Sequence, residues 1–343
     1  MTMPDSVILV VHGPEVFDAG DVAVLIDRLA PARIIVAGVM ARTAAEESGI
    51  PCEQAGLPPS MVIRDLPPAT VLANHGKTPE SGRIFGEIVA SRLAPRGLIQ
   101  LEASSRILYL WNREPDGLAR EIAEKTGYTI ETVRVPASRS AAQRTIRGCL
   151  PGEAVYVNGI VIGQATGPEV VIREEGGAII PVSGMKTKDH GLEKLAGQPL
   201  SDISRVWCKS GSVRGVSPRA GVPRTGRGRV LFIDHCGHRL YDDITPKTRG
   251  IVSVGDDTTA VCGHIAAHLG IPVLGIIDGD ADGIVPASFA PGSVIARAVR
   301  ERDDDIGREI EAMIPEETAA WEDVVERIIR YLGDRVEIVR PGG

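Results

Sequence analysis

The chain is poor in aromatic residues, which make up 3% of its 343 residues, whereas hydrophobic residues as a whole make up 43%. Its apolar surface therefore comes mainly from Val, Ile, Leu and Ala, which suits close-packed layers of parallel strands and helices. Surfaces that bind single-stranded nucleic acid stack bases on aromatic rings, so their scarcity argues against such a partner. The formal net charge of −7 argues the same way. We expect no nucleic-acid partner.

The chain also lacks several familiar sequence signals. Its cysteines are odd in number and form no C-x-x-C pair, so neither a zinc knuckle nor a disulfide framework is indicated: Cys52, Cys149, Cys208, Cys236 and Cys262. No segment approaches the roughly 20 apolar residues of a membrane helix. The N-terminal stretch MTMPDSVILVVHGPE has no basic region of a signal peptide. These absences predict a cytoplasmic protein with no membrane partner.

Apolar runs alternate with helical patterns in the first part of the chain. SVILVV (6–11) is followed by the helical pattern GDVAVLIDRLAP and by the apolar run RIIVAGV (33–39). A strand, a helix and a strand with short connections form a βαβ unit, which implies a parallel sheet. The same rhythm continues through TVLANHG (70–76) to TIETVRV (129–135). We predict a Rossmann-like α/β domain over residues 1–150, although no G-x-G-x-x-G fingerprint follows the first strand.

The pattern changes in the middle of the chain. Asn158-Gly159 and Gly176-Gly177 separate β-rich segments, and both pairs are hairpin signals. We predict a small antiparallel β module over 151–200. A long loop rich in Gly, Pro and Arg (207–229) comes next, and RVLFIDHCGH (229–238) restarts the α/β rhythm. We predict a second α/β domain over 201–343, with C-terminal helices over 293–314 and 318–333.

The stretch GIIDGDADGIV (275–285) places aspartates at alternate positions directly after an apolar strand, and GDDTTAV follows the strand before it. The carboxyl ends of neighbouring parallel strands share one edge of a sheet, where open α/β sheets bind ligands. Aspartates crowded there repel one another unless a cation lies among them, and oxygen ligands suit Mg²⁺. We predict that Mg²⁺ or another divalent cation is held by Asp256, Asp257, Asp278, Asp280 and Asp282.

The aspartate stretch also resembles a calcium-binding loop or a polar turn. An EF-hand is excluded, because the closing glutamate would stand at position 12 of the loop and Phe289 is there instead. A calcium loop of another kind and a plain polar turn, with Asp and Gly chosen for backbone reasons, both remain open.

Several further side chains are candidates for proton transfer or for binding an anion. His235 and His238 follow a predicted strand and could bind a transition metal or move a proton, or they could belong to an ordinary polar loop. His264 and His268, four residues apart, are expected on a helix surface or at an interface. The arginine-rich loop could hold a phosphorylated substrate or be an ordinary solvated surface loop. The predicted phosphate- or substrate-binding residues lie in this loop, at strand ends or at a helix start: His12, His75, Lys77, Arg214, Arg219, Arg224, Arg227, Thr258 and Thr259.

HGPEVFDAGD near the start, combined with VGDDTTAV and GIPVLGIIDGDADGIV near the end, resembles an uncharacterised archaeal protein family found largely in methanogens. The family is a domain of unknown function, and the resemblance spans most of the chain. It implies a cytoplasmic archaeal protein and brings no established activity or catalytic residue.

Two functions from different classes fit the sequence. The first is a divalent-metal-dependent enzyme that acts on a phosphorylated small molecule or nucleotide, by phosphoryl or diphosphoryl transfer or by phosphoester hydrolysis. The alternative is a non-catalytic ligand-binding or regulatory protein with a structural cation loop. The sequence leaves open whether the protein is catalytic at all and whether it forms a homo-oligomer.

Overall fold

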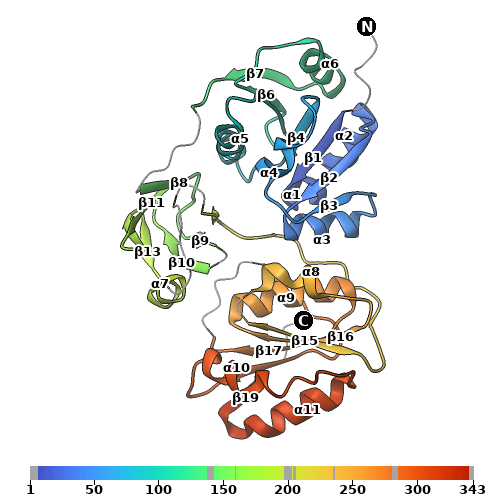
Figure 1. Ribbon diagram of the computed structural model, residues 1–343, viewed down its shortest axis with the longest axis vertical. Helices are drawn as coiled ribbons and strands as arrows, with labels where there is room; N and C mark the ends of the chain where they lie inside the picture. The colour runs from blue at the N-terminus through green and yellow to red at the C-terminus, as the bar shows by residue number, and fades with distance from the viewer. Residues whose placement is uncertain are drawn as a thin grey trace. The chain divides into compact units, whose positions relative to one another are not determined.

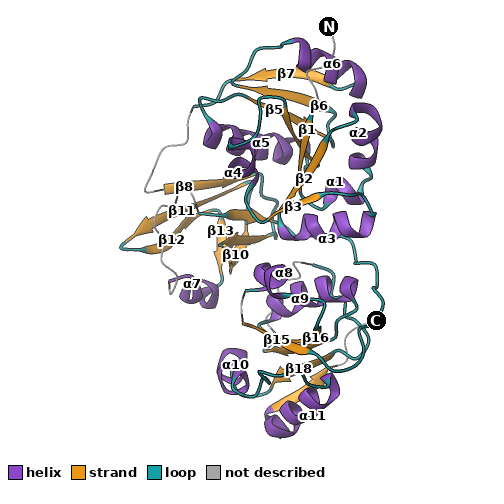
Figure 2. Cartoon of the chain, turned by 45° about the vertical axis from the view of Figure 1, so that its right-hand side comes forward, coloured by secondary structure: helices purple, strands orange, loops and turns teal. Residues whose placement is uncertain are grey.

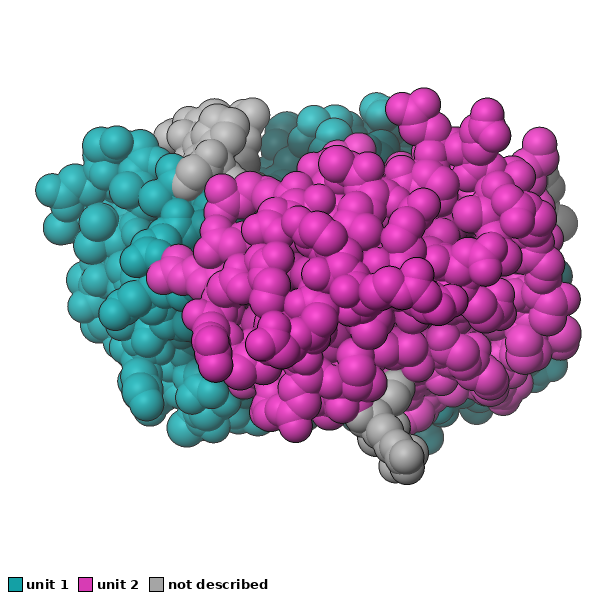
Figure 3. Space-filling model, turned by 90° about the horizontal axis from the view of Figure 1, so that it is seen from below, with its two compact units in different colours: residues 1–211 teal, residues 212–343 magenta. Residues whose placement is uncertain are grey.

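The structure is a computed structural model that describes residues 7–136, 143–158, 160–196, 203, 206–234, 236–279 and 285–339. The chain divides into two compact units, residues 1–211 and 212–343, which Figure 3 colours separately. The expected mixed α/β fold is confirmed: a mostly parallel sheet is followed by antiparallel sheets and by a second α/β region. Within the described residues, no helix has both the length and the apolar character needed to cross a membrane.

The first unit is built on a seven-stranded sheet (Figure 1). In spatial order its strands are β3 (Glu53–Ala55), β2 (Arg33–Ala37), β1 (Ile8–His12), β4 (Thr70–Asn74), β5 (Leu98–Glu102), β6 (Ile107–Trp111) and β7 (Thr129–Val133). Neighbouring strands are parallel except for β5 and β6, which form an antiparallel pair. The chain builds outward from β1 through β2 to β3 and then returns to place β4 on the other side of β1. The strand order therefore reverses at β1 and β4, the position where open α/β sheets bind ligands.

Helices cover both faces of this sheet, because alternate strand residues point to opposite faces and both sets are apolar. One face packs against α1 (Glu15–Asp18), α2 (Asp21–Leu29), α3 (Val39–Ser48) and α6 (Gly117–Thr126). The other face packs against α4 (Pro59–Arg64) and α5 (Pro79–Leu93). Helix α5 lies very close to the sheet, since a Cβ at Gly86 would stand 1.8 Å from Oε1 of Gln100. That oxygen accepts a hydrogen bond from Nε1 of Trp111 at 2.7 Å, so the buried amide is satisfied.

The rest of the first unit is antiparallel, as the hairpin signals predict (Figure 2). One sheet has the order β13 (Met185–Thr187), β10 (Ile160–Ala165), β9 (Ala154–Val157) and β14 (Cys208–Ser210). The other has the order β12 (Ala178–Ser183), β11 (Glu169–Glu175) and β8 (Gln143–Arg147), and α7 (Asp189–Ala196) packs on β10. Their apolar side chains meet in one core that includes Ile162 and Ile172, both fully buried.

The second unit contains a five-stranded sheet. Its order is β15 (Arg229–Asp234), β16 (Thr248–Val254), β17 (Val273–Ile277), β18 (Val294–Ala298) and β19 (Val336–Val339). The first four strands are parallel and β19 is antiparallel to β18. Helices α10 (Asp303–Glu311) and α11 (Trp321–Leu332) pack on one face, where they share a core with Val254 and Ile276. Helix α9 (Asp256–Leu269) packs against β16 and β17, and the short elements η1 (Gly237–Arg239), α8 (Leu240–Asp243) and η2 (Gly333–Arg335) complete the unit.

One element differs from the sequence prediction. Residues 293–314 were expected to form a helix, but Val294–Ala298 is strand β18 and the helix begins at Asp303. Ile295 and Ala296 are buried in the sheet beside β17. Pairing with β17 therefore outweighs the helical spacing of these few residues, as tertiary contacts often do for short apolar segments.

Candidate functional site

The strongest cluster of candidate ligands lies at the carboxyl ends of three neighbouring strands in the second unit. Gly255, with φ of 102°, makes the turn from β16 into α9 and places Asp256 at the first position of that helix. Asp278 directly follows β17. Asp303, which the sequence analysis did not single out, is the first residue of α10 and follows β18 by a short connection.

The three carboxylates are close together. One oxygen of each, from Asp256, Asp278 and Asp303, lies within 4.8 Å of the others. Asp256 and Asp303 are buried, with 8% and 2% of their surfaces exposed. The expectation that the loops after β16 and β17 meet is thus correct for Asp256 and Asp278, while the third carboxylate comes from the start of α10, which follows β18.

Backbone groups hold two of these carboxylates in place. Oδ2 of Asp256 accepts hydrogen bonds from the amides of Asp278 and Gly279, at 3.0 and 3.1 Å. Oδ1 of Asp303 accepts one from the amide of Asp304 at 2.9 Å. Oδ1 of Asp278 is also buried, yet it accepts no hydrogen bond from the described residues. A buried oxygen without a donor is costly, so this atom points to a missing positive partner.

The arrangement suits a hard divalent cation. Three carboxylates at this spacing repel one another, and a cation among them removes the repulsion and gives the Asp278 oxygen a partner. Carboxylate oxygens are the ligands preferred by Mg²⁺, Mn²⁺ and Ca²⁺, and waters or a substrate commonly fill the remaining positions of Mg²⁺. The residues present therefore fit the cation that the sequence predicts.

The other residues predicted for this edge have different surroundings. Asp257 and Thr258 follow Asp256 in the first turn of α9 and are half-buried. The hydroxyl of Thr259 is buried and lies 2.8 Å from that of Ser253 on β16, so it ties α9 to the sheet. Asp280, Asp282 and His235 lie outside the described residues, as does the side chain of His238. The backbone of His238 belongs to η1, which packs on α9.

Two arginines of the arginine-rich loop, Arg224 and Arg227, bond to backbone carbonyls away from the aspartates. Nε of Arg224 donates to the carbonyl of Leu269 at 3.2 Å, and its Nη1 donates to that of Thr245 at 2.9 Å, so it lies near the start of β16. Nη2 of Arg227 donates to the carbonyl of Thr318 at 3.1 Å, beside the start of β15. Both lie at the opposite edge of the sheet from Asp256. Arg219 is exposed and precedes Gly221, which bonds to the last turns of α9.

Arg214 and His264 form a buried contact that differs from the sequence expectation. His264 was expected on a helix surface or at an interface; none of its surface is exposed, and its Nε2 lies 3.3 Å from Nη1 of Arg214. The surface position is wrong for His264, because the loop around Arg214, itself 2% exposed, covers this side of α9. His268, one turn later, is half-buried.

The sequence candidates of the first unit do share one edge of their sheet. His12 ends β1, and His75 and Lys77 follow β4, the neighbouring strand. Nδ1 of His75 lies 2.8 Å from Oδ2 of Asp21. The ammonium of Lys77 is paired with Glu153 and donates to Oγ of Ser210 at 3.2 Å.

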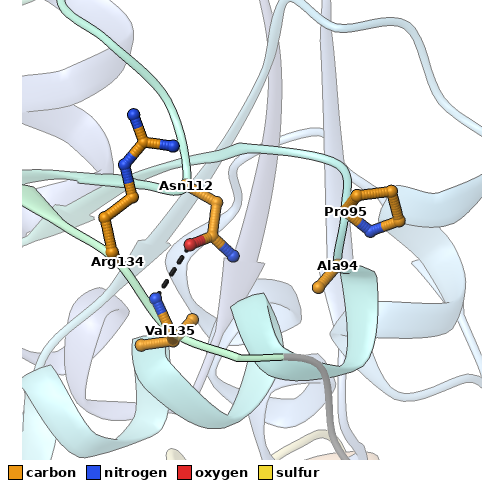
Figure 4. A pocket seen from close by; sticks show the side chains of 5 residues that line it. All are labelled: Ala94, Pro95, Asn112, Arg134 and Val135. Carbon is orange, nitrogen blue, oxygen red and sulfur yellow. Dashed lines mark hydrogen bonds between the residues drawn. The ribbon is translucent and has the colours of Figure 1, made fainter.

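A pocket of about 350 Å³ in the first unit is less suited to binding (Figure 4). Ala94, Pro95, Asn112, Arg134 and Val135 line it. Oδ1 of Asn112 is already occupied, because it accepts the amide of Val135 at 2.8 Å, and Arg134 is paired with Glu114. The pocket therefore presents few polar groups that converge on a ligand.

These features define an α/β protein with an acidic cluster at the carboxyl edge of the five-stranded sheet in its second unit. Residues 9–318 match the model of the family described as an uncharacterized protein conserved in archaea, DUF2117, so the chain belongs to this family. It is similar to the uncharacterized protein MJ0065 of Methanocaldococcus jannaschii, with 31% identity over 332 residues, 88% of this chain and 90% of that protein. No solved structure matches the chain.

Proposed function

We propose that the second unit binds one divalent cation through Asp256, Asp278 and Asp303, and that the protein is a metal-dependent enzyme acting on a phosphorylated small molecule. The observation that carries the proposal is the convergence of three carboxylates from three neighbouring strand ends, with a buried oxygen of Asp278 left without a donor. The cation would neutralise phosphate oxygens and orient the reacting group, as in other phosphoryl-transfer and phosphoester-hydrolysing sites.

Two arginines at this edge support a phosphorylated substrate better than the loop arginines do. Arg302 directly precedes Asp303 and is exposed. Cδ of Arg297 on β18 lies 3.6 Å from the place that a Cβ of Gly279 would occupy, so the side chain runs beside the loop after β17. Its guanidinium is paired with Glu337 at 2.6 Å and is about half exposed. Exchange of that carboxylate for a substrate phosphate is a modest rearrangement.

The experiment is an activity screen of the full chain with chelator, Mg²⁺, Mn²⁺ or Ca²⁺. Substrates are p-nitrophenyl phosphate, bis-p-nitrophenyl phosphate and nucleoside mono-, di- and triphosphates. We expect turnover of at least one class with Mg²⁺ or Mn²⁺, loss of that turnover in Asp303→Asn, and retention in Asp334→Asn, which removes an exposed carboxylate of η2. Cation binding without turnover of any substrate would contradict the enzymatic part and favour a structural cation.

A further inference from the structure

The first unit has a second group of charged side chains, where β1 and β4 meet the antiparallel strand β14. Lys77 follows β4, and its ammonium contacts Glu153 and the hydroxyl of Ser210, the last residue of β14. These contacts fix β14 against the carboxyl edge of the seven-stranded sheet, at the point where the strand order reverses. Lys209 is the neighbour of Ser210 on the same strand.

His12 presents a neutral imidazole to this edge. Its Nδ1 lies 2.9 Å from the carbonyl oxygen of Ala37, which can only accept, so Nδ1 carries the proton and Nε2 the lone pair. Its ring stacks on Phe85, with centroids 4.6 Å apart and an angle of 9° between the planes. The pKa of His12 is lowered to about 4, mainly by burial and to a smaller extent by the charge of Lys209, while the hydrogen bond to Ala37 opposes the shift. No described residue donates to Nε2, which is therefore a fixed acceptor.

Among the described residues, Lys209 carries a donor that lacks an acceptor, whereas Nε2 of His12 is an acceptor that lacks a donor. The side chain of Lys209 is half-buried, and no described residue accepts a hydrogen bond from its ammonium or lies within ion-pair distance. Burial lowers its pKa and the charge of Lys77 adds to this, whereas the charges of Glu15 and Glu153 raise it. Glu153 is already paired with Lys77 and accepts the amide of Leu150. An ammonium that is largely removed from water without a contacting acceptor is costly, so its surroundings favour an added anion.

We propose that this edge of the first unit binds a small molecule with a phosphate or carboxylate group. Lys209 contacts the oxyanion, and Nε2 of His12 accepts a hydrogen bond from a hydroxyl or amino group of the same molecule. The ligand thereby provides an acceptor for the ammonium of Lys209 and a donor for Nε2 of His12. The residues of this site belong to the first unit and those of the aspartate cluster to the second, and the proposed binding does not require the cation.

The test uses the unmodified full chain. Lysines are acetylated with a dilute N-hydroxysuccinimide ester, and the rate at each lysine is followed by peptide mass spectrometry. Inorganic phosphate, pyrophosphate or citrate is added, with sodium chloride as the control at equal ionic strength. We expect at least one of these anions to slow acetylation of Lys209 by about tenfold, the effect of a charge-assisted contact. Lys125, exposed and paired with Glu121 on α6, is the internal control whose rate stays unchanged.

Protection by the phosphates alone identifies a phosphate ligand, and protection by citrate alone a carboxylate ligand. Lys209→Met should abolish the anion-dependent rise in unfolding temperature, whereas Lys125→Met should retain it. Equal acetylation of Lys209 with every anion and with sodium chloride would overturn the proposal, and this result does not depend on how well any variant folds.

Discussion

The carboxylate of Asp256 accepts hydrogen bonds from the backbone amide of Asp278 at 3.0 Å and from the next amide at 3.1 Å. One side chain thus joins the loops after β16 and β17 and sets the position of the Asp278 carboxylate beside it. The cluster is therefore held by backbone contacts before any cation arrives, which reduces the ordering cost of binding.

Asp278→Asn should stabilise the protein without metal, because it removes one of three mutually repelling carboxylates. We expect an increase in the free energy of unfolding of about 1 kcal/mol in the presence of chelator. The same variant should lose the increase in unfolding temperature produced by Mg²⁺ or Mn²⁺ in the wild type. Both are measured by thermal unfolding, with Asp334→Asn as the control that changes neither. Destabilisation of Asp278→Asn under chelator would contradict the repulsion on which the cation site rests.

Gly275→Ala should disturb the packing of α9 on β17, the two elements that position Asp256 and Asp278. A Cβ at Gly275 would stand 2.2 Å from Cγ2 of Thr259, so β17 and α9 would have to move apart. We expect a loss of about 1–3 kcal/mol in stability, as for other overpacked positions, together with weaker cation binding. The matched control is Gly215→Ala, whose added methyl group meets nothing within 4 Å.

Thr259→Ser in the Gly275→Ala background should recover part of this loss, because it removes Cγ2 and keeps the hydroxyl that contacts Ser253. Denaturant unfolding of the two single variants and the double variant measures this coupling. Additive losses in the double variant would show that the clash between α9 and β17 is not the cause.

His12 should make stability depend on pH. Its folded pKa of about 4 lies below the unfolded value near 6.5, so the unfolded chain takes up a proton first as the pH falls. The stabilising contribution is complete above about pH 6.5 and is lost as the pH falls towards 4. Between pH 7 and pH 5, His12→Asn, which can still donate to Ala37, should reduce the loss of unfolding free energy by about 2 kcal/mol.

Denaturant unfolding at the two pH values tests this contribution, and proton NMR of the imidazole rings measures the pKa itself. The resonance that disappears in His12→Asn should titrate near 4 in the wild type. Titration of that resonance near 6.5 would show that the ring is not held neutral by burial.

Arg224 should matter for stability and not for the cation. It donates to the carbonyls of Leu269 and Thr245 at the edge opposite the aspartates. Arg224→Met should lower the free energy of unfolding by about 1–3 kcal/mol, because it leaves these acceptors without their donor. Arg330→Met removes an exposed arginine of α11 and should be nearly neutral. Weaker cation or substrate binding in Arg224→Met, at unchanged stability, would restore the sequence hypothesis that Arg224 binds phosphate.

The sequence was informative where neighbouring segments determine the geometry. Asp256 and Asp278 each follow an apolar strand of an α/β pattern, and parallel pairing of consecutive strands brings their ends together. Asp303 was missed because 293–314 has helical spacing, so the end of β18 was not recognised. Without that strand, the three acidic residues at 303–305 looked like ordinary helix-start residues.

Contacts between segments that are distant in the sequence could not be predicted from the sequence patterns. Lys209 reaches the edge beside His12 only because β14 pairs with β9 and Lys77 bonds to Ser210. The composition of the loop over 207–229 indicated many arginines, but a loop can run along either edge of a sheet. Arg224 and Arg227 donate to carbonyls of residues that are distant in the sequence, and only folding brings these carbonyls next to the loop.

The most direct test is the number and affinity of Mn²⁺ ions bound by the purified full chain, measured by electron paramagnetic resonance of the free ion. The account predicts one Mn²⁺ bound per chain, an affinity at least about tenfold lower in both Asp278→Asn and Asp303→Asn, and an unchanged affinity in Asp334→Asn. Absence of binding in the wild type, or a wild-type affinity in either Asp278→Asn or Asp303→Asn, would contradict it.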